Sequence, residues 1–285
     1  MKPSHPRNAK QNLIQETDLQ APLKILIVAS AYGVDYVQKQ GHAAVLPLAA
    51  SAGADGLEVR RELCAGSDAE IALQLASLKD AMEMHGLQAV YSAPESLFRQ
   101  SGDLDLALLA ARLHEATILG AARLKLQMHD YACAVDAAAL QHALSGSTVT
   151  LLLENGQQKT GSRVSEFASF FSICAVHSPA IPVAMTFDIG NWSWAGEDAV
   201  TAAQALASHV RYIHCKDVRG SGMRRFAVAP GEGSVDWRAC LARLPGDAPR
   251  AIEYPLPADP AAQMRHAQQL RSAPASLSHG ASTCQ

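Results

Sequence analysis

The stretch VTLLLE at residues 149–154 decides the fold, because an apolar, β-prone run ends abruptly on a carboxylate. Short apolar runs of this kind are typical of strands that are buried on both faces of a parallel sheet. Seven further runs of similar length follow the same pattern: LKILIVAS (23–30), DGLEVR (55–60), QAVYSA (88–93), ARLKLQM (122–128), PVAMTFD (182–188), VRYIHCK (210–216) and RAIEYP (250–255). The chain therefore contains eight candidate strands.

Helical patterns separate many of these strands. The segment 67–86 opens with a serine and a glutamate at capping-box spacing and stops at a glycine. Three more helices are predicted over 103–120, 197–209 and 259–271. Strand–helix alternation of this length predicts one α/β domain, a single (β/α)8 TIM barrel over residues 23–272. The alternative, an open doubly wound sheet, normally has a G-x-G-x-x-G after its first strand, and none follows here.

Composition excludes several classes of function. The net charge is −3, so the chain lacks the basic character of a nucleic-acid binder. No apolar run approaches the roughly 18 residues that span a bilayer. The polar segments 1–22 and 273–285 are expected to be a flexible arm and a flexible tail. None of the six cysteines forms a CxxC pair, which indicates reduced thiols in a cytoplasmic protein.

Four consecutive strands end on side chains that bind metals. They are Glu154, Asp188, His214 and Glu253, and each follows an apolar stretch. The carboxyl ends of barrel strands form one mouth, so these side chains should face one another there. Three carboxylates in contact repel, and a divalent cation removes that repulsion. Oxygen ligands with one nitrogen suit Mn²⁺, Mg²⁺, Co²⁺ or Zn²⁺. The alternative is that each residue is a separate salt-bridged strand end.

With this set of strand ends, the chain resembles the xylose isomerase-like superfamily of TIM barrels, in its sugar and sugar-phosphate isomerase and epimerase branch. The similar segments are GADGLEVRREL (53–63), LLLENGQQ (151–158), MTFDIGNWSWAGEDA (185–199), YIHCKDVRG (212–220), GEGSVDW (231–237) and AIEYP (251–255). YSAPESLF and TFDIGNW are most similar to epimerases predicted from 2-ketogluconate utilisation clusters. The resemblance implies a metal-dependent isomerase or epimerase for a sugar or keto-sugar acid. It is also compatible with a homo-oligomer.

The resemblance also implies roles for residues. Glu154, Asp188, His214 and Glu253 would hold one divalent metal ion. Glu154 and Glu253 would also be the catalytic acid and base, which remove and return a proton next to a carbonyl through an enediolate. Three positions depart from ketose 3-epimerases: Asn191 replaces a substrate-binding histidine, the loop 155–162 lacks an acidic residue, and Arg219 is one residue out of register.

Six residues are predicted to contact the substrate: Glu58, His129, Asn191, Trp192, Lys216 and Arg219. Lys216 shares the inward face of its strand with His214, although an interior ion pair with Asp188 or Glu253 is an equal alternative. Glu58 could instead orient a metal ligand or pair with Arg60, Arg61 or Lys125. His129 could equally be a loop residue, and Trp192 could pack within its own loop. Asp217 is expected to cap a loop, and Ser234 to cap a helix.

Three other functions remain open on the sequence. An inosose-type dehydratase would share the metal and the first proton abstraction, and would then expel a hydroxyl. An apurinic endonuclease would need further histidine and acidic ligands at the first strands, together with a basic surface. A non-catalytic sugar-binding barrel would not need the four-ligand set. Isomerase or epimerase activity is therefore the leading hypothesis, with a small-molecule substrate and no nucleic-acid or membrane partner.

Overall fold

Eight parallel strands close into a barrel in the computed structural model, which describes residues 22–158, 160–177, 181–222 and 224–274. Around the barrel the strands follow the order β1, β10, β7, β6, β5, β4, β3, β2. Their bounds are Ile25–Val28 (β1), Gly56–Arg60 (β2), Gln88–Ser96 (β3), Arg123–Gln127 (β4), Thr150–Glu154 (β5), Val183–Asp188 (β6), Val210–Cys215 (β7) and Arg250–Ile252 (β10). The predicted (β/α)8 barrel is confirmed. Except for residues 22, 273 and 274, the predicted arm and tail lie outside the described residues.

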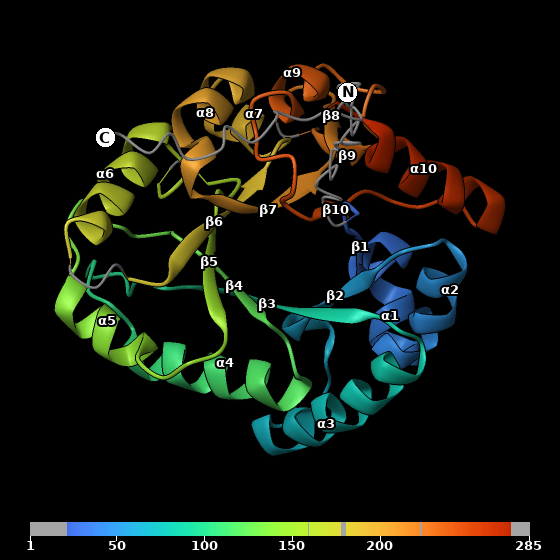
Figure 1. Cartoon of the computed structure of the whole chain (residues 1–285), viewed down its shortest axis with the longest axis horizontal. Helices are drawn as coiled ribbons and strands as arrows, with labels where there is room; N and C mark the ends of the chain where they lie inside the picture. The colour runs from blue at the N-terminus through green and yellow to red at the C-terminus, as the bar shows by residue number, and fades with distance from the viewer. Residues whose placement is uncertain (1–21, 159, 178–180, 223, 275–285) are drawn as a thin grey trace, which may run out of the picture.

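Helices form a shell around this barrel (Figure 1). The α-helices are Val34–Gln40 (α1), Leu46–Ser51 (α2), Asp68–Met84 (α3), Leu106–Leu119 (α4), Ala137–Leu144 (α5), Val164–Ala175 (α6), Trp192–Ala195 (α7), Ala199–Leu206 (α8), Trp237–Leu241 (α9) and Pro260–Ser272 (α10). Short 3₁₀ turns are Ala29–Tyr32 (η1), His42–Val45 (η2), Arg61–Leu63 (η3) and Ala207–His209 (η4). Ser67 and Glu70 form the predicted capping box of α3.

Period-two alternation along the strands divides the barrel into layers. On β5, Leu151 and Leu153 pack outward against the helices, while Leu152 points into the barrel. Leu152 joins a small apolar plug inside the barrel with Leu26, Val28, Val90, Ala184, Tyr212 and Ala251. Two residues after Leu152, Glu154 stands on the same inward face at the carboxyl end of the strand. The polar layer therefore lies directly above an apolar one.

A hairpin interrupts the last repeat of the barrel. Its strands, β8 (Asp217–Arg219) and β9 (Phe226–Val228), pair antiparallel outside the closed barrel. The Asp217 carboxylate accepts hydrogen bonds from the backbone N–H of Val218, Gly231, Gly233 and Val235, so its predicted role as a loop cap is confirmed. The prediction for Ser234 is wrong: Asp236 caps α9 by accepting from the N–H of Ala239.

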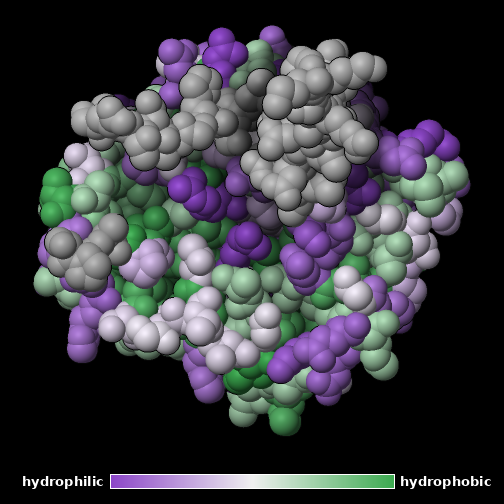
Figure 2. Space-filling model, in the orientation of Figure 1, coloured by the Kyte–Doolittle hydropathy of each residue, from purple (hydrophilic) through white to green (hydrophobic). Residues whose placement is uncertain are grey.

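The surface and the composition of the helices fit a globular barrel. Figure 2 shows hydrophilic residues near the centre of the face in view and around its rim, with apolar residues between them. Among the described residues, no helix combines the length and apolarity that a membrane crossing requires. The cysteines within the described ranges, which are Cys64, Cys133, Cys174, Cys215 and Cys240, are free thiols.

Candidate metal centre

Four side chains from neighbouring strands converge at the mouth of the barrel. Glu154, Asp188 and His214 stand at the ends of β5, β6 and β7, and Glu253 follows β10 directly. One possible ligand atom from each lies within 4.8 Å of the other three. Glu154, Asp188 and His214 are almost fully buried, whereas Glu253 is partly open to the mouth. The strand order places the two glutamates on either side of the aspartate and the histidine.

Glu154 has its two carboxylate oxygens in different surroundings. Oε2 accepts hydrogen bonds from Lys125 Nζ and Gln127 Nε2, two side chains of β4, and each donor lies 2.5 Å from Oε2. Oε1 faces the cluster and lies 2.7 Å from His214 Nδ1. Burial alone would raise the pKa of Glu154, but the charges of Lys125 and His214 hold it well below its usual value. Glu154 is therefore an ionised carboxylate with one oxygen fixed by the protein.

The two carboxylate oxygens of Asp188 also have different surroundings, and here backbone N–H groups bind the outer one. Its Oδ1 accepts from the N–H groups of Gly190 and Asn191, both at 2.9 Å, while Oδ2 lies 3.7 Å from His214 Nδ1. The amide of Asn155 pairs with the backbone N–H and C=O of Asp188, which fixes the end of β6 against the end of β5. Burial raises the pKa of Asp188 to about 6. This buried carboxylate therefore benefits from a cation close to Oδ2.

Glu253 completes the set in the same way. Its Oε1 accepts from Arg60 Nη1 at 3.1 Å, and its Oε2 lies 3.1 Å from His214 Nδ1 and 2.7 Å from Lys216 Nζ. Burial opposes ionisation, but Lys216 and His214 hold the pKa of Glu253 well below its usual value. All three carboxylates thus have an outer oxygen bound by the protein and an inner oxygen turned toward His214 Nδ1.

Glu58 orients His214 through the ring nitrogen that does not face the other three carboxylates. His214 Nε2 lies 2.7 Å from Glu58 Oε2, while Lys125 Nζ is 3.6 Å from Glu58 Oε1. Burial would lower the pKa of His214, but Glu58, Glu253 and Glu154 raise it well above its usual value. Glu58 is fully buried and is not among the residues that line the mouth cavity, so the structure places it against His214 and not toward the cavity. Of the sequence-based alternatives, Glu58 both pairs with Lys125 and orients the histidine.

The donor set fits a divalent metal ion. Three inner carboxylate oxygens and one imidazole nitrogen converge, a combination that Zn²⁺, Mn²⁺ and Co²⁺ accept. A carboxylate on the far nitrogen of a ligating histidine, as Glu58 is here, is the usual support for such a ligand. Residues Glu154, Asp188, His214 and Glu253 could therefore hold one ion. They form the single cluster of this kind within the described ranges of the chain.

A polar cavity of about 370 Å³ opens above this cluster. Of the predicted substrate residues, His129, Asn191 and Lys216 line it, together with Glu154 and Glu253. The other lining residues were not predicted from the sequence, and they are Arg60, Pro94, Gln127, Gly156, Gln157 and Gln158. The alternation of Lys125 and Gln127 on β4 was the available signal for Gln127, since it places both on the inward face.

The structure places two of the predicted substrate residues away from the mouth cavity. Trp192 begins α7 and is fully buried, with its ring centroid 6.1 Å from that of Phe167 and 5.4 Å from that of Phe187. Its indole packs in the core, so a sugar in the mouth does not reach it. Arg219 lies exposed on β8, where its Nε donates to the backbone oxygen of Glu232 at 2.9 Å. Neither residue lines the mouth cavity.

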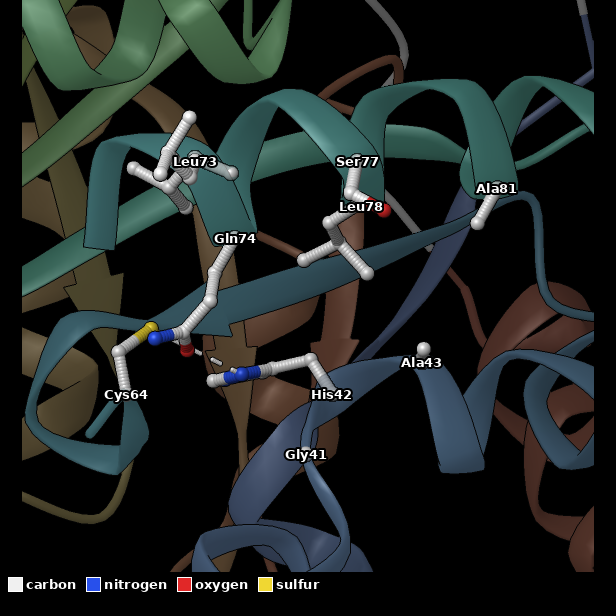
Figure 3. Close-up of a pocket in the computed structure, with 10 residues that line it drawn as sticks. Gly41, His42, Ala43, Cys64, Leu73, Gln74, Ser77, Leu78 and Ala81 are labelled. Carbon is white, nitrogen blue, oxygen red and sulfur yellow. Dashed lines mark hydrogen bonds between the residues drawn. The ribbon is translucent and has the colours of Figure 1, made fainter. Parts of the chain in front are cut away.

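A second cavity of about 390 Å³ lies outside the barrel, between η2 and α3. Figure 3 shows His42 and Cys64 facing each other on one side, and Leu73, Gln74 and Leu78 of α3 on the other. Cys64 Sγ is 3.9 Å from His42 Nδ1, and His42 Nε2 accepts from the backbone N–H of Arg60 at 3.1 Å. Burial lowers the pKa of His42 to about 4, so this histidine is neutral.

Solved structures support the fold of the chain. D-psicose 3-epimerase with D-tagatose from Clostridium cellulolyticum H10 superposes with a TM-score of 0.62 at 16% identity, covering 86% of this chain and 96% of that one. The IolI protein with a binding zinc atom superposes with a TM-score of 0.66 at 13% identity, covering 87% of this chain and 96% of that one. A third structure is the probable 3-DHS dehydratase AsbF, which is involved in petrobactin synthesis, from Bacillus anthracis. It superposes with a TM-score of 0.64 at 12% identity, covering 87% of this chain and 98% of that one. At these identities the likeness concerns the fold.

Sequence comparison gives the family. No curated protein matches the chain. The family model of the xylose isomerase-like TIM barrel matches residues 46–273, which include all four residues of the candidate metal centre. With this match over most of its length and a closed eight-stranded barrel, the chain belongs to the xylose isomerase-like TIM barrel family.

Proposed function

We propose that the protein is a divalent-metal-dependent isomerase or epimerase that acts on a sugar or keto-sugar acid. The observation that carries this proposal is the convergence of three inner carboxylate oxygens on His214 Nδ1 beneath a polar cavity. Two structural neighbours, a D-psicose 3-epimerase and a zinc-containing IolI protein, agree with an epimerase-like reaction and a metal. The bound ion would polarise a substrate carbonyl and so acidify the adjacent C–H group.

The two glutamates provide the acid–base chemistry. Glu154 and Glu253 both line the cavity and come from strands on opposite sides of β6 and β7. Both are ionised, so either can accept a proton from a carbon atom between them. For the second step the other glutamate must already hold a proton taken up from solvent, and it donates that proton to the enediolate. Return to the opposite face of the same carbon gives epimerisation, and return to the neighbouring carbon gives isomerisation.

The lining of the cavity favours a polyhydroxylated substrate with an acidic group. Amide side chains of Gln127, Gln157, Gln158 and Asn191 can donate to and accept from hydroxyl groups. The cationic Arg60 and Lys216 border the same space. Large apolar side chains are absent from its described lining, so a hydrophobic ligand would gain little there.

The experiment combines metal analysis with a deuterium-exchange screen. Purified protein loaded with Mn²⁺, Co²⁺, Mg²⁺ or Zn²⁺ is incubated in D₂O with ketoses, keto-acids and inososes, and exchange of the proton next to the carbonyl is followed by NMR. We expect exchange with inversion or carbonyl migration, and its loss in Glu154→Gln and Glu253→Gln. Full exchange activity in both variants would refute the assignment.

Two outcomes select another function. Release of water from an inosose or a dehydroshikimate-type keto-acid would identify a dehydratase, the class of enzyme to which the neighbour AsbF is assigned as a probable member. Failure to bind any divalent ion, with unchanged sugar binding, would identify a non-catalytic barrel. A phosphodiesterase with a multinuclear centre is disfavoured, because the described residues contain one four-ligand cluster and no second one beside it.

A further inference from the structure

Lys216 occupies part of the candidate metal centre. Its ammonium nitrogen lies 2.7 Å from Asp188 Oδ2 and 2.7 Å from Glu253 Oε2. These are the inner oxygens of the two carboxylates, because Oδ1 of Asp188 and Oε1 of Glu253 are bound elsewhere. Two of the four converging ligand atoms are thus already paired with a cation that belongs to the chain.

Lys125, the other lysine at this site, is arranged differently. It binds Glu154 through the outer oxygen Oε2, and it also lies 3.6 Å from Oε1 of Glu58, which is not one of the four candidate ligands. Lys125 is 1% exposed and does not line the mouth cavity. A metal ion on Glu154 Oε1 would leave the contacts of Lys125 in place. Of the two lysines, only Lys216 therefore competes with a metal ion for the ligand oxygens.

An ammonium and a divalent ion on the same two oxygens repel each other twice as strongly as two unit charges do. Lys216 also has somewhere to move, because its side chain borders the cavity. Its stem packs against Gly190, where a Cβ would lie 2.8 Å from Lys216 Cγ and 3.2 Å from Lys216 Cε. Because Gly190 has no side chain, the aliphatic part of Lys216 has room to pack against it.

We propose that Lys216 is a built-in counter-cation that holds the Asp188 and Glu253 ligand oxygens without metal and is displaced into the mouth cavity when the divalent ion binds. The inference rests on the proposed metal-dependent function. In the displaced position the ammonium faces the substrate, beside Arg60, and can donate hydrogen bonds to an acidic group or hydroxyl. Metal loading would then assemble the substrate subsite as well as the metal centre.

The first test is the chemical reactivity of the lysine. Full-length protein, with and without Zn²⁺ or Mn²⁺, is treated with formaldehyde and a borohydride, and methylation of each lysine is measured by peptide mass spectrometry. We expect methylation of Lys216 to rise at least severalfold when metal is bound, while Lys125 stays protected in both states. Metal uptake with unchanged or reduced Lys216 reactivity overturns the inference alone. Absence of metal uptake overturns the proposed function as well.

The second test measures metal affinity by calorimetry. Lys216→Met removes the competing ammonium and should bind Zn²⁺ at least tenfold more tightly than wild type. Arg60→Met is the matched control: it also removes one positive charge near Glu253, but Arg60 Nη1 supports the outer oxygen, so this variant should bind Zn²⁺ no more tightly than wild type. Equal effects of the two variants, or weaker binding in Lys216→Met, contradict displacement. If a variant does not fold, the methylation experiment on wild type still decides.

Discussion

Two cavities of similar size, about 370 and 390 Å³, differ in every chemical respect. The mouth cavity is lined by amides, cations and two glutamates, whereas most of the residues that line the outer cavity belong to α3 and include three leucines (Figure 3). Each has a buried histidine beside it. His214 is surrounded by carboxylates that raise its pKa, whereas burial dominates at His42 and lowers its pKa to about 4.

One residue joins the two regions. The backbone N–H of Arg60 donates to His42 Nε2, and its side chain donates to Glu253. Despite this link, the pKa values of the two histidines shift in opposite directions, because the local carboxylates decide the balance between desolvation and Coulomb attraction. The comparison shows that cavity volume does not identify a functional site in this barrel. The mouth cavity differs from the outer one in having convergent strand ends whose polar atoms are held by hydrogen bonds, and the following predictions test that difference.

The largest expected difference concerns metal binding by the two histidines. Four-ligand zinc sites have apparent binding free energies of about 10–16 kcal/mol, so losing one ligand should remove about 3 kcal/mol or more. We therefore expect His214→Gln to weaken Zn²⁺ binding by on the order of a hundredfold to a thousandfold in calorimetry. His42→Gln is the matched control and should leave the affinity within about threefold of wild type, since it touches no ligand. Equal losses would show that the outer histidine is part of the centre.

A change in the outer cavity should affect stability and leave metal affinity unchanged. Leu78 is 6% exposed and lines this cavity, so Leu78→Ala enlarges an apolar void and should destabilise the protein by about 2–3 kcal/mol. Leu73 lies on the same helix but is 73% exposed, and Leu73→Ala should change the free energy of unfolding by under about 0.5 kcal/mol. Urea denaturation measures both. A large change in Zn²⁺ affinity in Leu78→Ala would contradict the separation of the two regions.

The neutral state of His42 predicts a pH dependence of stability. Its pKa is about 4 when folded and about 6.5 when unfolded, so the unfolded chain binds the extra proton between these values. The free energy of unfolding is therefore not reduced by His42 above pH 6.5, and it decreases as the pH falls toward 4. At pH 5 the loss should be about 2 kcal/mol, and it should disappear in His42→Gln. A pH-independent difference between wild type and this variant would contradict a buried neutral imidazole.

The sequence predicted the parts of the molecule that depend on strand periodicity. Glu154 and Asp188 each end an apolar run, and this position alone places them at the mouth of a barrel. Trp192 could not be placed in the same way, because the short helix α7 turns its ring into the core. Arg219 could not be placed either, because the β8–β9 hairpin carries it outside the closed barrel.

Other features depended on contacts between distant segments. The outer cavity combines η2 with α3, and the sequence carries no periodic signal for that packing. The period-two alternation of β2 and β4 offered a signal for the inward direction of Arg60 and Gln127, but it could not show which oxygen of a carboxylate each would bind. The division into inner and outer oxygens is a three-dimensional property, and it is the feature that distinguishes the mouth from the outer cavity.

The smallest expected effect tests the support of His214 by Glu58. A ligating histidine whose far nitrogen loses its carboxylate partner typically loses about 10–100-fold in metal affinity. In Glu58→Gln the amide oxygen can still accept from His214 Nε2, so we expect a loss near tenfold, about 1.4 kcal/mol. Calorimetry with Zn²⁺ measures it, and Glu58→Ala should lose more. If Glu58→Gln bound metal as tightly as wild type, the imidazole would be oriented by the other three carboxylates, and His214 would need no support from Glu58.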